Sequence, residues 1–153
     1  MILHFFVSQA LINTRAIRIK IVISLLVLTP IGFASKFYNG PAAWWFNDYA
    51  GGMLYELFWC LVVVLIWPQV SRFKVALWVL GVTSFLEWFQ LAHPPFLETI
   101  RSTFIGRTLI GTSFSWWDFP YYVVGCFFGW LWIGFLRRSA LSDQKDHHHA
   151  DRK

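Results

Sequence analysis

The chain has 153 residues, of which 57% are hydrophobic and 14% are charged, whereas a soluble domain usually carries about 25% charged residues. Water is therefore excluded as the solvent of most of the chain, and the length predicts one compact domain. The formal charge of +5 does not predict nucleic-acid binding, because the basic residues flank apolar runs and form no stripe interleaved with stacking aromatic residues.

Four apolar runs follow one another along the chain. They cover about residues 19–34, 49–67, 73–92 and 118–136, and Pro68 closes the second of them. The second and third are near the ~20 residues that a helix needs to cross a bilayer. We predict an all-α integral membrane bundle of four transmembrane helices, with residues 1–18 before it and a disordered tail over 137–153.

The first run has a competing interpretation as a cleavable signal peptide. Gly32 and Ala34 are small residues in the right relation for cleavage after Ala34. The chain after this point is itself strongly apolar, which favours a first span.

The positions of Lys and Arg predict the orientation of the bundle. Ten of these residues fall on one side of the four runs and three on the other. The ten are Arg15, Arg18, Lys20, Arg72, Lys74, Arg137, Arg138, Lys145, Arg152 and Lys153, and the three are Lys36, Arg101 and Arg107. Because cytoplasmic loops carry the excess of basic residues, both termini are expected on the cytoplasmic side of a membrane that the chain crosses several times.

The loop between the third and fourth runs carries a short helical pattern. Pro95 suits the first position of a helix, and the apolar residues Leu97, Ile100, Phe104 and Ile105 share one face. We predict a short interfacial helix that carries Arg101 at the outer surface.

Polar residues are expected to gather in the outer half of the bundle. Glu56 and Glu87 lie roughly 10 Å below the outer ends of their helices by the ~1.5 Å helical rise, and Asp118 opens the fourth run. Such groups are costly in hydrocarbon and should find partners inside the bundle. The predicted ligand-binding site consists of Glu87, Gln90, Arg101 and Asp118, with Glu56 and Tyr122 beside them. Gly125 and Gly129 have the small-x-x-x-small spacing that permits close helix packing.

Three functions fit this polar cluster. It could bind a lipid-linked or amphiphilic component of the cell envelope that arrives from the outer leaflet. Alternatively, the cluster only holds helices together in an accessory subunit of a membrane complex whose protein partner is unknown. A small proton-coupled transporter that uses Glu56 or Glu87 is the third alternative.

Catalysis and metal binding have the least support. No nucleophile turn, phosphate loop or dinucleotide fingerprint occurs, so no catalytic residue and no cofactor is predicted. Cys60 and Cys126 lie inside apolar runs and are expected to be packing residues. The tract from His147 to His149 lacks further ligands, so no metal site is predicted.

A set of motifs is spread over residues 32–129. They are Gly32-Phe33-Ala34-Ser35-Lys36, Tyr49-Ala50-Gly51-Gly52, Ser84 to Leu91 with Glu87 and Gln90, Ile100-Arg101-Ser102-Thr103, Gly111, Phe114, Trp116, Asp118, Tyr122 and Gly125. In order and spacing they resemble a bacterial family of small polytopic membrane proteins known as domain of unknown function 2809, which implies a multi-pass protein of the bacterial inner membrane. The chain departs from the family pattern at Gly52, where an acid is common, and at Lys36, where arginine is usual.

A second likeness concerns the layout alone. A Glu-x-x-Gln span, a loop arginine and an acid that opens the next span are similar to the arrangement in VanZ-like proteins, which are linked to glycopeptide resistance. This resemblance implies a task in the cell envelope and no particular reaction.

Overall fold

The computed structural model describes residues 2–91, 95–103, 106 and 114–150, except the side chains of 2–13, 48, 97 and 143–150. Every regular element in this part of the chain is helical, in agreement with the predicted all-α class. The elements are α1 (Ile2–Ser35), α2 (Ala43–Trp45), the π-helical turn η1 (Phe46–Ala50), α3 (Gly51–Ile66), α4 (Arg72–Phe89), α5 (Pro95–Arg101) and α7 (Asp118–Ala150).

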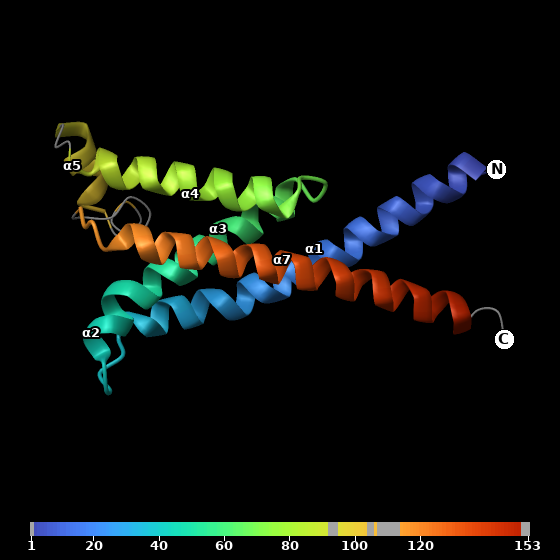
Figure 1. The fold of residues 1–153 in the computed structure, drawn as a ribbon, viewed down its shortest axis with the longest axis horizontal. Helices are drawn as coiled ribbons and strands as arrows, with labels where there is room; N and C mark the ends of the chain where they lie inside the picture. The colour runs from blue at the N-terminus through green and yellow to red at the C-terminus, as the bar shows by residue number, and fades with distance from the viewer. Residues whose placement is uncertain (1, 92–94, 104–105, 107–113, 151–153) are drawn as a thin grey trace.

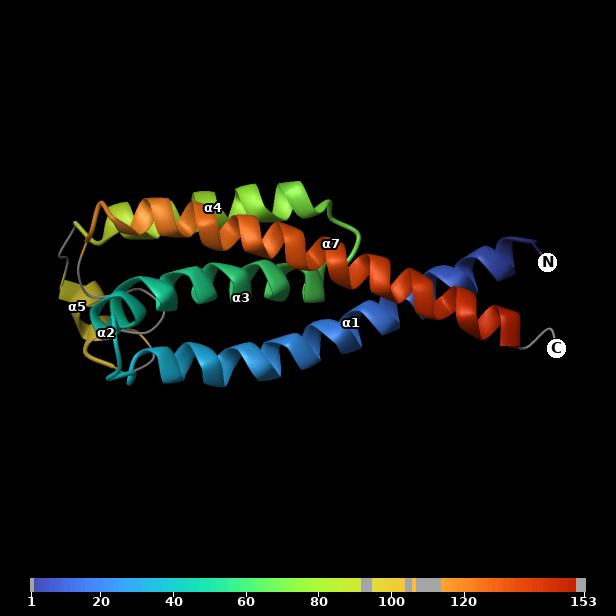
Figure 2. The ribbon, with the colours of Figure 1, turned by 60° about the horizontal axis from the view of Figure 1, so that its bottom comes forward.

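The four long helices lie alongside one another as a bundle (Figure 1). α3 and α7 form its central pair, because each contacts the other and also contacts both α1 and α4. Both chain termini lie at one end, and α2 and α5 lie at the opposite end (Figures 1 and 2). The end with α2 and α5 is called the loop end below.

Local signals account for the ends of α3 and α4. α3 stops at Ile66, two residues before Pro68, whose ring disfavours a helical conformation in the residue that precedes it. α4 begins after Ser71, whose hydroxyl accepts a hydrogen bond of 3.3 Å from the Lys74 backbone N–H. This is a standard N-cap. The two helices coincide with the predicted runs at 49–67 and 73–92.

Aliphatic side chains and two cysteines fill the centre of the bundle. The fully buried members include Ile21, Cys60, Leu61, Val64, Val75 and Ile133. Many other large apolar side chains point outward, among them Leu26, Phe73 and Trp78. A soluble monomer rarely exposes so much contiguous apolar surface. Two segments, Thr14–Lys36 and Asp118–Ser142, are long and apolar enough to cross a membrane.

The first and last helices extend beyond the predicted membrane spans. α1 begins at Ile2 and contains the predicted span at 19–34. α7 continues to Ala150, although disorder was predicted over 137–153. No Gly or Pro interrupts residues 137–150, and Leu136 and Ala140 are buried against the bundle. Tertiary packing therefore continues this helix beyond its apolar part.

A short helix does occur in the loop between α4 and α7. It begins at Pro95, as predicted, and ends at Arg101. Phe96 and Ile100 on it are exposed. Phe104, Ile105 and Arg107, which were also expected in this loop, lie outside the described residues.

Candidate functional site

Glu87 is the centre of the polar contacts at the loop end. Its side chain is 1% exposed, and its carboxyl group accepts three hydrogen bonds. Gln90 Nε2 and Tyr122 OH each donate to Oε2 at 2.8 Å, and the Ser115 backbone N–H donates to Oε1 at 2.9 Å. These three donors satisfy most of the acceptor capacity of the carboxyl group. Glu87 thus links α4 to α7 and to the segment before α7.

Glu56 lies in a separate contact at the centre of the bundle. Its side chain is fully buried, and Oε2 accepts a hydrogen bond of 3.1 Å from Cys126 Sγ on α7. Oε1 has no hydrogen-bond partner among the described residues. Cys126 is therefore a weak donor as well as a packing residue. The lone sulfur contact leaves Glu56 much less satisfied than Glu87.

Arg101 pairs locally instead of with the acids of the bundle. Its Nη1 lies 3.1 Å from Glu98 Oε1, one turn earlier on α5. No ion pair joins Arg101 to Glu87 or Asp118 within the part of the chain that the structure describes. The expected meeting of these three charges is thus not seen, because the i, i+3 spacing on α5 offers a nearer carboxylate.

Asp118 occupies the first turn of α7, one turn before Tyr122. An acid at this position is favoured by the helix dipole. Tyr122 also packs on α3, since a methyl group built on Gly52 would lie 3.6 Å from its ring. The structure therefore brings Glu87, Gln90 and Tyr122 together, with Asp118 one turn away, and leaves Glu56 and Arg101 in other contacts.

Two glycines of α7 lie at its contact with α3. A methyl group built on Gly125 would be 2.7 Å from Glu56 Cβ and from the Met53 carbonyl oxygen. One built on Gly129 would be 2.8 Å from Cβ and Sγ of Cys60. Neither position has room for a side chain, so the glycines set the short separation of these two helices.

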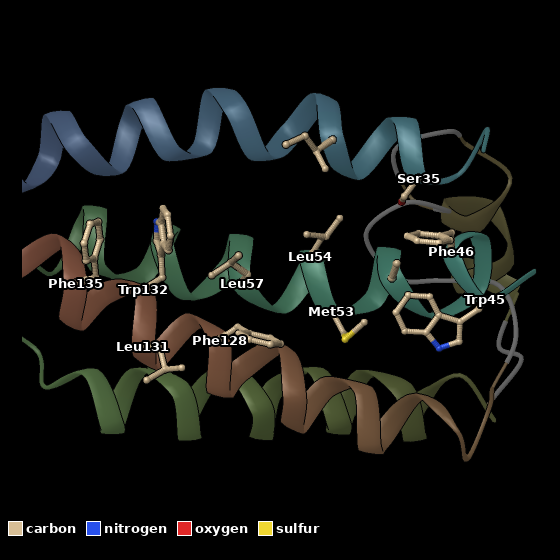
Figure 3. Close-up of a pocket in the computed structure, with 12 residues that line it drawn as sticks. Ser35, Trp45, Phe46, Met53, Leu54, Leu57, Phe128, Leu131, Trp132 and Phe135 are labelled. Carbon is tan, nitrogen blue, oxygen red and sulfur yellow. The ribbon is translucent and has the colours of Figure 1, made fainter. Parts of the chain in front are cut away.

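An apolar groove, which was not anticipated, lies between α1, the η1–α3 segment and α7 (Figure 3). Its volume is about 690 Å³. The lining residues are Ile31, Ser35, Trp45, Phe46, Ala50, Met53, Leu54, Leu57, Phe128, Leu131, Trp132 and Phe135. None of the six predicted site residues is among them. The one available signal was the helical spacing of Phe128, Leu131, Trp132 and Phe135, which places four bulky side chains on one face of α7.

The polar atoms in the groove wall are all bonded within the protein. Ser35 donates to the Gly32 carbonyl oxygen at 2.8 Å. The indole N–H groups of Trp45 and Trp132 donate to Tyr121 OH and Ser24 Oγ, each at 3.2 Å. The side chains of the groove therefore present carbon and sulfur surface to an occupant.

Comparison with known proteins gives one result. A family described as a protein of unknown function (DUF2809) matches residues 41–126, which is more than half of the chain. No curated protein and no solved structure matches the chain. The likeness to VanZ-like proteins stays a prediction. The family match confirms the resemblance carried by motifs such as Tyr49 to Gly52 and Ser84 to Leu91, and we conclude that the chain belongs to the DUF2809 family.

Proposed function

We propose that the chain is a four-span protein of the bacterial inner membrane that binds an amphiphile, with the alkyl chain of the amphiphile in the groove between α1, α3 and α7. The observation that carries this proposal is the groove itself, whose wall is apolar and has its polar side-chain atoms already bonded. A ligand with polar groups would lose hydrogen bonds to water there and gain none. An alkyl chain makes no hydrogen bonds to water, so it loses none when it enters the groove.

The dimensions of the groove suit one acyl chain. Its volume of about 690 Å³ lies in the range of ~300–1,000 Å³ found for small-molecule sites. The lining residues from Ala50 at the end of η1 to Leu57 on α3, and from Phe128 to Phe135 on α7, each extend roughly 10 Å at ~1.5 Å per residue. That length is a large part of one leaflet, which is half of the ~30 Å hydrocarbon core.

The arrangement of the helices supports four crossings. Both termini lie at the same end of the bundle (Figures 1 and 2), as an even number of crossings requires. Nineteen residue steps separate Asp118 from Arg137 on α7, and roughly 28 Å at the helical rise nearly equals the ~30 Å core. α3 is shorter, and the π-helical turn Phe46–Ala50 extends it toward the loop end.

The contacts that several basic residues make support a cytoplasmic position for the end of the bundle that holds both termini. Arg137 Nη2 donates to the carbonyl oxygens of Pro68 and Val70 in the α3–α4 turn. Arg72 lies over the Trp130 ring at 4.2 Å, and Lys20 donates to Ser139. α1, the turn and α7 thus place their cations in one layer. A basic layer on a single side is the arrangement that the positive-inside rule associates with the cytoplasm.

Two alternatives each have an observation in their favour. The three donors around Glu87 favour an accessory or structural subunit, because a carboxylate so fully satisfied needs no ligand. The single weak donor to Glu56 favours proton-coupled transport, in which a buried acid takes up and releases a proton. Neither alternative accounts for the groove.

A matched pair of substitutions on α7 tests the proposal. Phe128 and Phe127 are adjacent and similarly exposed, at 51% and 53%, but only Phe128 lines the groove. We expect Phe128→Asn to reduce the lipid that co-purifies with the protein in mild detergent, measured by mass spectrometry per mole of protein. Phe127→Asn should retain it, because that side chain is not among the residues that line the groove.

The comparison separates groove binding from general detergent effects. Both variants place the same polar group on an exposed surface of the same helix, so their membrane insertion should be affected equally. Equal lipid content in the two variants, or no bound lipid in the native protein, would show that the groove has no such occupant.

A further inference from the structure

Arg101 at the end of α5 is a buried cation that uses only part of its hydrogen-bonding capacity. Its side chain is 5% exposed, and its Nη1 contacts Glu98 at 3.1 Å. Nε and Nη2 are buried and have no hydrogen-bond partner among the residues that the structure describes. Buried guanidinium donors that lack partners are rare, because each one forgoes the hydrogen bonds that it would make to water.

The two unused nitrogens belong to the same side of the guanidinium group. Nε–H and an N–H of Nη2 point in parallel along one edge of the planar group. This edge binds the two oxygens of a carboxylate or a phosphate at the same time. Glu98 occupies the other side through Nη1, and its side chain is 52% exposed. The edge that is suited to a bidentate anion is thus the one whose donors lack a hydrogen-bond partner.

We propose that Arg101 binds a phosphate group at the loop end of the bundle, with its Nε–Nη2 edge as the recognition element. The loop end, where α5 lies (Figures 1 and 2), is the outer membrane surface in the proposed topology. The oxyanions concentrated at a membrane surface are the phosphates of lipid headgroups. The phosphate site is independent of the groove, since no residue of α5 lines the groove.

The test uses the full chain in uncharged dodecyl maltoside micelles and follows its melting temperature. Dioctanoyl phosphatidylglycerol is compared with dioctanoylglycerol, which has the same chains and no phosphate. Stabilisation common to both lipids reports the alkyl chains. The phosphate lipid should act at an apparent concentration at least about tenfold lower, because a charge-assisted hydrogen bond contributes a factor of that size.

Two variants assign this preference to Arg101. Arg101→Lys keeps the charge but lacks the two parallel donors, so it should lose the tenfold preference for the phosphate lipid. Glu98→Gln removes a competing anion and should keep the preference or strengthen it by up to about fivefold, the equivalent of an exposed ion pair. The Glu98→Gln result tests the site even if Arg101→Lys does not fold.

Inorganic phosphate and acetate at equal ionic strength complete the experiment. Stabilisation by inorganic phosphate that depends on Arg101 would identify free phosphate as a second source of the same group. The proposal is overturned if the two lipids act at equal concentrations, if Arg101→Lys keeps the preference, if Glu98→Gln loses it, or if acetate acts as well as phosphate. Absence of stabilisation by dioctanoylglycerol would instead count against the groove.

Discussion

Replacement of Glu87 by Gln should destabilise the protein by about 2–4 kcal/mol without loss of bound lipid. The amide oxygen can take the position of Oε2 and keep the bonds from Gln90 and Tyr122, which then weaken because the acceptor is neutral. The amide nitrogen then faces the Ser115 backbone N–H, so the introduced amide N–H group is a buried donor without an acceptor. That donor contributes about 1–3 kcal/mol and the two weakened bonds account for the rest.

The assay is reversible unfolding in mixed dodecyl maltoside and dodecyl sulfate micelles, with co-purifying lipid measured on the same samples. Tyr122→Phe removes one of the same hydrogen bonds. The double variant should therefore lose less stability than the sum of the two single variants. Native stability in Glu87→Gln would refute the assigned hydrogen bonds. Unchanged stability together with loss of lipid would instead indicate that Glu87 is a ligand-binding residue, as the sequence predicts.

The remaining predictions use the same unfolding assay or chemical labelling. Gly125→Ala should be about 1–3 kcal/mol less stable than Gly81→Ala. Both variants gain helix propensity, but only Gly125→Ala forces a methyl group against α3. Equal stability of the two variants would mean that α3 and α7 are further apart. Glu56→Gln should change the free energy of unfolding by less than about 1 kcal/mol, because the carboxyl group accepts from one weak sulfur donor. A loss of stability as large as that of Glu87→Gln would contradict this prediction. A cysteine introduced at Asn39 should react with an impermeant maleimide added to intact cells, whereas one at Ser142 should react only after permeabilisation. Labelling of Ser142→Cys from outside would disprove the topology.

The two middle helices in chain order, α3 and α4, could be predicted more closely than the last helix, α7. Apolar runs closed by Pro68 and capped by Ser71 define α3 and α4, because the signals that start and stop these helices are local. The length of α7 could not be derived in this way. Its residues after Leu136 are mostly polar, and the burial of Ala140 shows that tertiary contacts continue beyond the apolar run.

The polar contacts likewise divide into those that spacing along one helix predicts and those that depend on how two helices pack. Gln90 is the C-cap of α4 and lies one turn from Glu87, so their contact follows from helical spacing. The contact of Tyr122 with Glu87 depends on the register between α4 and α7, which no local pattern specifies. Arg101 was expected to pair with Glu87 or Asp118, and Glu98 was overlooked although it lies one turn away.

The groove could not be predicted because it results from unequal packing on two faces of α7. Gly125 and Gly129 allow close approach to α3 on one face. On the adjacent face, Trp132 and Phe135 project toward α1 and line the groove together with Phe128 (Figure 3). Each pattern can be read along α7 alone, but the space appears only when three helices are placed together. In the proposed topology, an alkyl chain would enter this groove from the surrounding hydrocarbon and leave its headgroup at the membrane surface.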